Sequence, residues 1–496
     1  MNYTSTRNRE VVVSAAQAIA QGISAEGGLF VPQSLPRIAT ERLESLVHKN
    51  YKERACDILA DFLDDFTPEE IRSCVEGAYG GGKFADPRIA PMSRLGQNAY
   101  LLELWHGPTC AFKDMALQLL PHLLTASMEK VGQGREAAIL VATSGDTGKA
   151  ALEGFRDVPG TSILVFYPQD GVSKIQKLQM QTQEGANVGV QGVYGNFDDT
   201  QNGVKAIFTD PDMNRRLAEQ NKMFSSANSI NWGRLVPQIV YYVSAYCDLV
   251  LDEEIALGDS INIAVPTGNF GNILAAYYAK KMGLPVGKLI CASNVNNVLT
   301  DFITSGTYDR RREFIMTSSP SMDILISSNL ERLLFALYGE DDKAVAGLMD
   351  SLAKKGAYTV SDTVKTRLQE QFSAGFCDER STADTIRETF EQYDYLCDTH
   401  TAVALKVYRE YVKAAGDDTK TIIASTASPY KFAGSILKAL KGKEEEDEFR
   451  QTELLSELTN TQVPRQIQVL EEKPIRFGQV CAKEEMPGAV AAMLNL

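Results

Sequence analysis

From Tyr100 onward, short apolar runs alternate with segments of helical periodicity, and this alternation limits the fold more than any other feature. Six runs have the length and composition of buried strands: residues 137–143, 161–167, 187–193, 261–265, 289–293 and 421–425. Turn residues and then a helical pattern follow each run, as expected of parallel β-α-β units. The sequence therefore predicts an α/β fold with parallel sheets, in which ligands bind beyond the carboxyl ends of the strands.

The chain has 496 residues, which is too many for one compact core, so several domains are expected. Residues 1–92 are predicted to form a mostly helical N-terminal domain, in which residues 12–23 fit one face of an amphipathic helix and Thr67 caps another. Residues 93–440 are expected to form two α/β subdomains. In that part, residues 115–131 are predicted to form one long helix and residues 341–395 a charged helical insertion. Residues 441–496 are predicted to be a C-terminal extension that packs on the subdomains and begins with a solvated run of charges.

The balance of charge and the cysteine pattern exclude several kinds of partner. A net charge of −14 argues against nucleic acid, because a phosphate backbone requires a basic face. No run approaches the ~20 apolar residues of a membrane span. The 8 cysteines form no C-x-x-C pair and the 4 histidines are dispersed, so we expect no metal site. Reduced thiols in the cytoplasm are the simplest explanation.

A lysine lies in a segment of small and apolar residues that runs from His106 to Asp114. Lys113 follows an apolar stretch and precedes a helical pattern, so it falls in a predicted strand-to-helix turn. Burial in such a turn favours the neutral amine, which is the form that makes a Schiff base with an aldehyde. Taken alone, a lysine in this context more often buries its stem and solvates its amine. Cys110 is expected to be a small core-filling residue rather than a reactive thiol.

Two Gly-rich turns follow predicted strands and open predicted helices. The first runs from Thr143 to Gly148 and the second from Pro266 to Asn272. Small residues let the backbone approach a ligand, and free amides at a helix start suit an anion. The second turn would hold a phosphate monoester without a lysine. Each turn alone is more often a structural connection, but a buried lysine together with two such turns is more specific.

Phosphate-loop alternatives are not supported. Residues 77–83 satisfy G-x-x-x-x-G-K, but Phe84 stands where a Ser or Thr would hold magnesium. Neither Gly-rich turn contains G-x-G-x-x-G, so a dinucleotide site is not indicated.

The order of these segments resembles the threonine synthase family, in its long form with an extra N-terminal domain. The resemblance is carried by the three turns and by residues 3–7, 27–32, 228–234, 398–402 and 426–432. It implies a pyridoxal-phosphate enzyme with the tryptophan synthase β-like fold.

The resemblance also implies roles for individual residues. Lys113 would carry the cofactor as a Schiff base. Asp146 would face the hydroxyl of the cofactor ring, and Thr426 would hydrogen-bond the pyridine nitrogen. The cofactor phosphate would rest on Gly268, Asn269, Phe270, Gly271 and Asn272. The family commonly reads Thr-Ala-His-Pro-Ala-Lys-Phe at the last motif, whereas this chain has Ser428 and Tyr430 at the third and fifth positions.

The substrate implied is O-phospho-L-homoserine, which loses phosphate from the γ carbon and gains water at the β carbon to give L-threonine. Lys113 would act as base and acid in turn. A dianionic substrate requires cationic and polar partners. The residues expected to contact it are Ser144, Thr147, Lys174, Asn231 and Arg234. His400 is expected to be a structural hydrogen bonder.

Other functions remain open at this point. A serine or threonine dehydratase, or a cysteine-synthase-like enzyme, would share the fold and the cofactor. A non-catalytic relative that binds a phosphorylated ligand is less well supported, because Lys113 and the second Gly-rich turn are intact. We expect a monomer or a homodimer.

Overall fold

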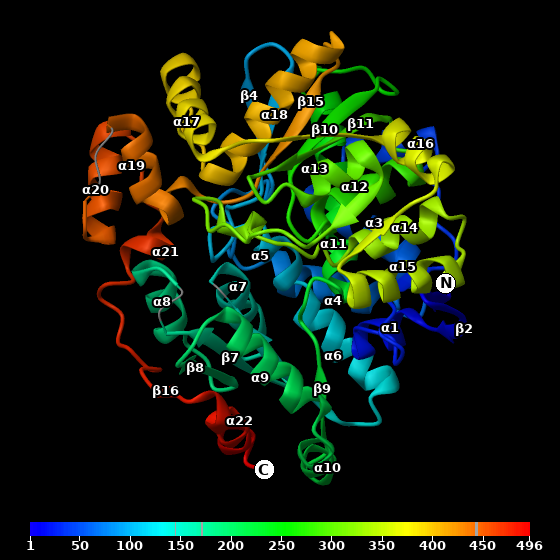
Figure 1. Cartoon of the computed structure of the whole chain (residues 1–496), viewed down its shortest axis with the longest axis vertical. Helices are drawn as coiled ribbons and strands as arrows, with labels where there is room; N and C mark the ends of the chain where they lie inside the picture. Colours follow the sequence, from blue (N-terminus) through cyan, green and yellow to red (C-terminus); the bar gives the residue numbers. More distant parts are fainter. Residues whose placement is uncertain (144, 170–171, 442–444) are drawn as a thin grey trace.

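Two mostly parallel sheets organise the chain, and the computed structural model describes residues 1–143, 145–169, 172–441 and 445–496 (Figure 1). The larger sheet has the order β14 (Phe372–Phe376), β11 (Val286–Ser293), β10 (Ile261–Pro266), β15 (Thr421–Ser425), β5 (Ala99–Glu103) and β4 (Met92–Leu95). The smaller sheet has the order β16 (Val480–Cys481), β8 (Val188–Val193), β7 (Thr161–Pro168), β6 (Glu136–Ala142) and β9 (Lys222–Ser225). All pairs are parallel except β4 with β5. The predicted α/β fold is therefore confirmed.

The six predicted strands form within a few residues of their expected bounds, because each is buried along most of its length. Strand β14 was missed, since residues 341–395 were predicted to be a helical insertion. Its sequence is short, contains glycine and is only partly buried, so it carries little strand signal, yet it pairs with β11 at the sheet edge. The region otherwise holds α15 (Asp342–Lys355), α16 (Asp362–Gln371), α17 (Glu379–Tyr393) and β13 (Ala357–Thr359), which pairs with β12 (Thr307–Asp309).

The prediction of a mostly helical N-terminal region is wrong in part. A three-stranded antiparallel sheet begins the chain, with strands β1 (Tyr3–Ser5), β2 (Asn8–Val13) and β3 (Phe30–Pro32). Three valines favour the extended chain at the end of β2, and the capping box of Ser14 and Gln17 starts the helix only afterwards. The helices are α1 (Ala15–Gln21), α2 (Thr40–Val47), α3 (Tyr51–Phe62) and α4 (Pro68–Tyr79), the last capped by Thr67 as predicted.

The single helix predicted for residues 115–131 is two helices, α5 (Lys113–Leu117) and α6 (Leu120–Val131). Pro121 lies in the first turn of α6, where its missing N–H is tolerated, and the helical conformation is interrupted just before this turn. Helix α11 (Trp232–Leu251) is buried along most of its length and packs against α2, α3, α5 and α12 (Gly271–Met282).

The remaining helices lie around the sheets. They are α7 (Asp146–Phe155), α8 (Lys174–Gln181), α9 (Phe197–Thr209), α10 (Pro211–Glu219), α13 (Val298–Ser305), α14 (Leu330–Leu337), α18 (Thr399–Ala415), α19 (Ala433–Lys441), α20 (Glu448–Thr459), α21 (Arg465–Gln468) and α22 (Met486–Leu494). Three short 3-10 helices join them: η1 (Pro320–Met322), η2 (Pro429–Phe432) and η3 (Lys483–Glu485).

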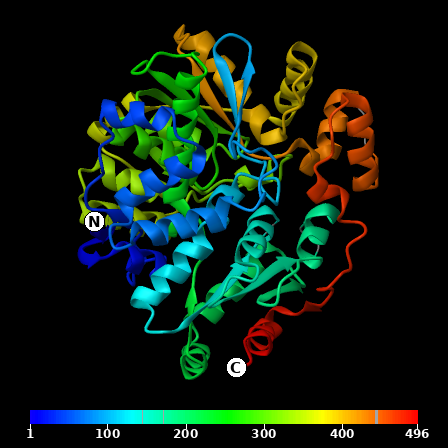
Figure 2. The ribbon, with the colours of Figure 1, turned by 180° about the vertical axis from the view of Figure 1, so that it is seen from behind.

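The C-terminal segment passes from one sheet region to the other, as seen from behind in Figure 2. Helix α20 packs on α19 and α8, and the chain then adds β16 to the smaller sheet before α22 packs on β7 and β8. The predicted run of charges at 441–448 lies partly outside the described residues. The domain limits at 92 and 440 stay predictions.

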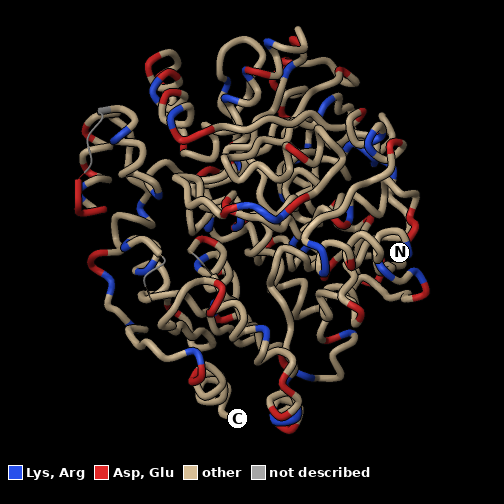
Figure 3. Tube along the Cα trace, in the orientation of Figure 1, with Lys and Arg blue, Asp and Glu red and all other residues tan. Residues whose placement is uncertain are grey.

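Acidic and basic residues lie side by side on the outer helices, for example on α10 and α17 (Figure 3). Arg215 pairs with Asp212 and Glu219 on α10, and Arg387 pairs with Asp384 on α17. None of the helices in the described ranges combines the length and apolar character needed to cross a bilayer.

The N-terminal sheet is anchored to α14 by one buried carboxylate. Glu331 accepts from the Thr6 hydroxyl at 2.5 Å and from the Arg7 guanidinium at 2.8 and 2.7 Å. The neighbouring Arg332 donates to the carbonyls of Phe30 and Ile230 at 2.9 and 2.6 Å. These contacts join the end of the first strand to α14, which lies more than 300 positions later in the sequence.

Replacing Glu331 with alanine is expected to lower the free energy of unfolding by about 3 kcal/mol, since the substitution leaves buried donors unpaired. Urea denaturation followed by tryptophan fluorescence measures it, because Trp232 contacts Tyr3 and Phe62. Asp212→Ala on exposed α10 is the matched control and should cost less than about 1 kcal/mol. Equal losses in the two variants would contradict the anchoring role.

Candidate active site

Lys113 lies at the start of α5, in a loop held against the end of β15. Ala111 forms an isolated bridge with Ala427, and the Phe112 N–H donates to the Thr426 carbonyl at 2.8 Å. The Ser428 N–H donates to the Cys110 carbonyl at 3.0 Å. Two segments separated by more than 300 residues therefore pair at the carboxyl ends of β5 and β15.

The amine of Lys113 has few polar neighbours. Its Nζ donates to Ser321 Oγ at 3.1 Å. Removal of water from around the amine lowers the pKa of Lys113 to about 8, with Asp146 opposing the shift and Lys431 and Arg234 adding to it. About a tenth of the amine is therefore neutral at pH 7, far more than for an ordinary lysine, which suits attack on an aldehyde.

Asp146 and Lys431 form a buried ion pair next to Lys113. Asp146 opens α7 after β6, and its Oδ1 lies 2.7 Å from Lys431 Nζ. The Lys431 amine also donates to the Thr109 carbonyl at 2.9 Å, and the Gln176 amide donates to Asp146 at 3.1 Å. Burial alone would raise the pKa of Asp146, but Lys431 and Lys113 hold it well below its usual range.

Lys431 is a residue of the site that the sequence did not predict. It is the one charged residue in the segment 426–432, and this contrast is the signal that could have identified it. Because Lys431 and Asp146 are more than 280 positions apart, their pairing follows only from the meeting of η2 with α7.

The second Gly-rich turn joins β10 to α12 in a conformation that leaves amides free. Phe270 has a φ of 63°, and a Cβ at Gly268 would lie 2.5 Å from the Ser321 carbonyl oxygen. The Thr267 N–H donates to the Ala292 carbonyl at 2.9 Å, whereas at Gly268 and Asn269 the carbonyls accept, from the Ser327 hydroxyl at 2.7 Å and the Asn329 amide at 3.1 Å. The turn at the start of α12 can hold an anion.

Asn272 presents an unused donor in the same turn. Its Oδ1 accepts from the Tyr242 hydroxyl, while its Nδ2 is buried with no partner among the described residues. A buried donor without a partner costs free energy unless a ligand supplies an acceptor.

Arg234 is a buried cation that no carboxylate neutralises within the described residues. Its Nη1 donates to the Ala227 carbonyl at 2.6 Å, and its Nε is buried without a partner. Desolvation lowers its pKa to about 10, so the guanidinium stays charged at neutral pH. A buried guanidinium with open donors suits an anionic ligand.

The other residues expected to contact a ligand differ in their burial and in their partners. Thr147 is partly buried in the first turn of α7, and Thr426 is buried at the end of β15. Ser144 lies outside the described residues. The amine of Lys174 points to Asp447 at 2.6 Å in an ion pair that is about half exposed, so this conformation does not bring it to Lys113.

The side chain of Asn231 is used within the protein, although a ligand contact was predicted for it. Its side chain caps α11 by accepting from the Gly233 N–H at 2.9 Å, and it donates to the carbonyls of Ile19 and Ser226 at 2.9 Å. Because these bonds occupy both ends of the amide, Asn231 positions α11 and the nearby Arg234 rather than contacting a ligand with that side chain.

The two departures in the last motif have different surroundings. The Tyr430 hydroxyl bonds to Thr461 in the C-terminal segment, at 2.9 Å to its carbonyl and 2.6 Å to its hydroxyl. The Ser428 hydroxyl is fully buried and has no partner among the described residues. Cys110 is buried and burial raises the pKa of its thiol to about 12, as expected of a core residue.

These residues fit a phosphorylated aldehyde. A partly neutral amine, a turn with free amides and an unused Asn272 donor lie at the ends of β5, β10 and β15. A buried carboxylate stands beside the amine. Such a set can bind the group covalently through Lys113 and hold its phosphate through the turn.

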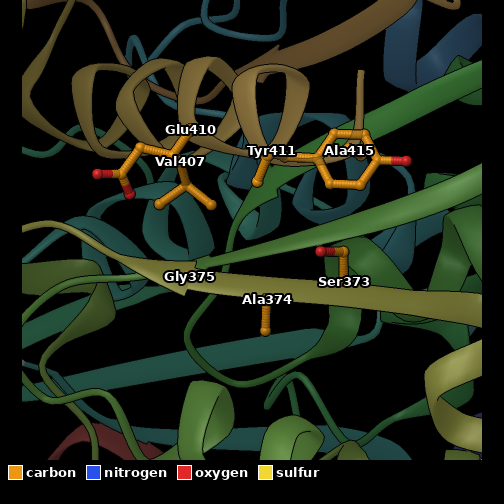
Figure 4. A pocket seen from close by; sticks show the side chains of 8 residues that line it. Ser373, Ala374, Gly375, Val407, Glu410, Tyr411 and Ala415 are labelled. Atoms are coloured by element: carbon orange, nitrogen blue, oxygen red, sulfur yellow. The ribbon is translucent and has the colours of Figure 1, made fainter. Parts of the chain in front are cut away.

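A separate pocket of about 370 Å³ lies between β14 and α18 (Figure 4). Ser373, Ala374 and Gly375 line it from the strand, and Val407, Glu410 and Tyr411 line it from the helix. It shares no residue with the predicted site.

Three family models match the chain. They are the N terminus of threonine synthase over residues 2–79, a pyridoxal-phosphate dependent enzyme over residues 87–426, and the C-terminal part of threonine synthase over residues 401–490.

Individual proteins agree with these matches. Human threonine synthase-like 1 is 43% identical over 440 residues, which cover 86% of this chain and 58% of that protein. The chain thus spans less than two thirds of that relative. Threonine synthase of Pseudomonas aeruginosa is 38% identical, with 88% of this chain and 90% of that protein covered.

Solved structures extend the likeness to the whole fold. Crystal structures of PLP-bound threonine synthase from Brucella melitensis and of threonine synthase from yeast superimpose with TM-scores of 0.89 and 0.90, at 36% and 31% identity. Each alignment covers 100% of this chain and 100% or 99% of the other.

Proposed function

The chain belongs to the threonine synthase family, and we propose that it converts O-phospho-L-homoserine and water to L-threonine and phosphate with pyridoxal phosphate bound at Lys113. The proposal includes a cytoplasmic location and a monomer or homodimer. One observation carries it. The Lys113 amine donates at 3.1 Å to Ser321, whose carbonyl lies against Gly268 of the Gly-rich turn, and the buried Arg234 has an unused Nε and no carboxylate partner in the described residues.

Each part of the site has a proposed task. The amides of the turn from Gly268 to Asn272 hold the cofactor phosphate, and Thr426 and Asp146 face the cofactor ring. The bound cofactor supplies an electron sink for the substrate carbons. Lys113 takes up a proton at Nζ from a substrate carbon and returns it at a later step.

Arg234 is proposed to bind the phosphate of the substrate. Its fixed position comes from the capped start of α11, where Asn231 holds the first turn and the Ala227 carbonyl accepts one N–H. The remaining donors can form parallel bonds to phosphate oxygens. Loss of a dianion's partner in a buried site is costly, so the role predicts a large effect on binding.

Replacing Arg234 with methionine is expected to lower kcat/KM for O-phospho-L-homoserine about 100-fold, mainly through KM, because a charge-assisted bond is lost. Arg234→Lys should recover only part of this, since an ammonium cannot bind bidentately. Phosphate release measures both variants. Arg215→Met on exposed α10 is the control. A kcat/KM for Arg234→Met within threefold of the parent would refute the assignment.

The test of the function is turnover by the purified, cofactor-loaded protein. Incubation with O-phospho-L-homoserine should yield threonine and phosphate in equal amounts. Faster turnover of L-serine would favour a dehydratase, and faster turnover of O-acetyl-L-serine with sulfide would favour a cysteine-synthase-like enzyme. No turnover of any substrate, with no adduct on borohydride reduction, would favour a non-catalytic relative.

A further inference from the structure

The hydroxyl that accepts from the Lys113 amine belongs to a short helix, η1, in which the sequence predicted no site residue. Ser321 is the middle residue of η1, and its Oγ lies 3.1 Å from Lys113 Nζ. It is the only hydrogen-bond partner of that amine among the described residues. Ser321 is 208 positions from Lys113 in sequence, so other contacts must hold it there.

His400 holds the backbone of Ser321. The Ser321 N–H donates to His400 Nε2 at 3.2 Å, and His400 Nδ1 lies 2.8 Å from Asp398 Oδ1. A backbone N–H can only donate, so Nε2 must carry the lone pair and Nδ1 the hydrogen. The ring is therefore fixed in one tautomer, with its hydrogen directed to Asp398.

Asp398 is itself immobilised at the start of α18. It is fully buried, caps the helix by accepting from the His400 N–H at 2.9 Å, and accepts from the Thr401 hydroxyl. The edge of Phe432 packs on the His400 ring with centroids 5.0 Å apart. The imidazole thus has neither rotational nor tautomeric freedom.

The other side of η1 contacts the second Gly-rich turn, from Pro266 to Asn272. Any side chain at Gly268 would place its Cβ 2.5 Å from the Ser321 carbonyl oxygen. Asp323 fixes the far end of η1 by accepting from Asn294 at 2.8 Å and from the Thr317 hydroxyl at 2.8 Å. Ser321 is held between the turn, α18 and Lys113.

We propose that Ser321 is a further catalytic residue that orients the Lys113 amine, and that His400 and Asp398 are positioning residues which act through it. The inference rests on the proposed role of Lys113 as base. A neutral amine has two N–H bonds and one lone pair. When Ser321 accepts one N–H, rotation about the Cε–Nζ bond is restricted and the lone pair is limited to the two remaining positions on Nζ.

The proton transfer involves only the substrate and the Lys113 amine. A substrate C–H bond breaks, its proton forms a third N–H bond on Nζ, and the electron pair stays on the substrate. The bond from Nζ to Ser321 persists through this change, because the ammonium also donates. The return of the proton to carbon reverses the step from the same position.

The decisive comparison is Ser321→Ala against Ser321→Thr in the cofactor-loaded chain. Alanine should lower kcat about 10- to 100-fold with KM changed less than threefold, and threonine should retain most of kcat because it keeps the hydroxyl. With α-deuterated O-phospho-L-homoserine, the isotope effect on kcat should increase in the alanine variant as proton transfer becomes limiting. A merely structural residue would not change the isotope effect.

His400 offers a matched pair for the positioning role. Glutamine places its amide oxygen near the depth of Nε2 and can accept from the Ser321 N–H, whereas asparagine reaches only the depth of Nδ1. His400→Asn should therefore resemble Ser321→Ala, and His400→Gln should lie within about fivefold of the parent. Equal losses in the two would overturn the positioning role.

Borohydride reduction and peptide mass spectrometry separate the outcomes. An adduct absent from Lys113 in the parent would remove the proposed function, and with it this inference. An adduct on Lys113 in both the parent and Ser321→Ala, with equal kcat and equal isotope effects, would overturn the role of Ser321 alone.

Discussion

Replacing Lys113 with alanine is expected to abolish covalent attachment of the cofactor and to lower threonine formation by at least about 10⁴-fold, because the variant loses both the tether and the base. Borohydride reduction followed by peptide mass spectrometry measures the first effect, and phosphate release measures the second. Lys354→Ala, at an exposed ion pair on α15, is the matched control and should retain both properties.

The same amine has an expected pH dependence with a definite sign. Its pKa is lowered to about 8, so its neutral fraction rises about tenfold per unit up to pH 8 and levels off above it. At pH 7 its neutral fraction would be about 300-fold larger than that of a lysine that titrates at its ordinary pKa.

Competitive acetylation of the cofactor-free chain, read by mass spectrometry on the peptide that carries Lys113, gives this titration directly. An acetylation midpoint of Lys113 near pH 10 would contradict the desolvation of its amine. An adduct on another lysine in the loaded protein would contradict the assignment of Lys113 itself.

Six strands of the two sheets were predictable from the sequence because they are buried along most of their length, whereas the partly buried β14 was not. Strands β10 and β15, for example, are buried along their whole length, and each is followed by a turn and a helix. The turn from Gly268 to Asn272 was visible for the same reason, since a Gly-rich segment after such a strand has a defined place at the sheet edge.

What sequence could not predict depends on contacts between distant segments. Lys431 and Ser321 reach Asp146 and Lys113 only because η2 and η1 meet the first turns of α7 and α5. Lys174 shows the reverse case. Its amine could bind a phosphate, but it forms an ion pair with Asp447, the N-cap of α20.

Polar residues near a site also have structural uses that composition does not reveal. Asn231 lies in a polar cluster next to Arg234, but all of its side-chain bonds go to the backbone. Strands β1, β2 and β3 were missed because short antiparallel strands have little periodicity of their own. Their stability comes partly from Glu331, which only tertiary structure brings near.

Replacing Lys431 with methionine is expected to lower the free energy of unfolding by about 3–5 kcal/mol, because the substitution leaves the buried Asp146 carboxylate without its partner. Urea denaturation measures the loss. The double variant Asp146→Asn/Lys431→Met should recover most of it, since removing both charges leaves no uncompensated ion. An additive loss in the double variant would show that the two residues stabilise the fold independently.

The same substitution is expected to change the chemistry of Lys113. Lys431 now shares Asp146 with the Lys113 amine, and it lowers the pKa of Lys113 while Asp146 raises it. Without Lys431, the carboxylate would pair with Lys113, so the acetylation midpoint of Lys113 should move above 8 and the cofactor should attach more slowly at pH 7. In Asp146→Asn/Lys431→Met the midpoint should return toward 8, because both opposing charges are gone. If the single variant instead left the midpoint unchanged while lowering stability, Lys431 would act on the fold alone and the Asp146 charge would not reach the amine.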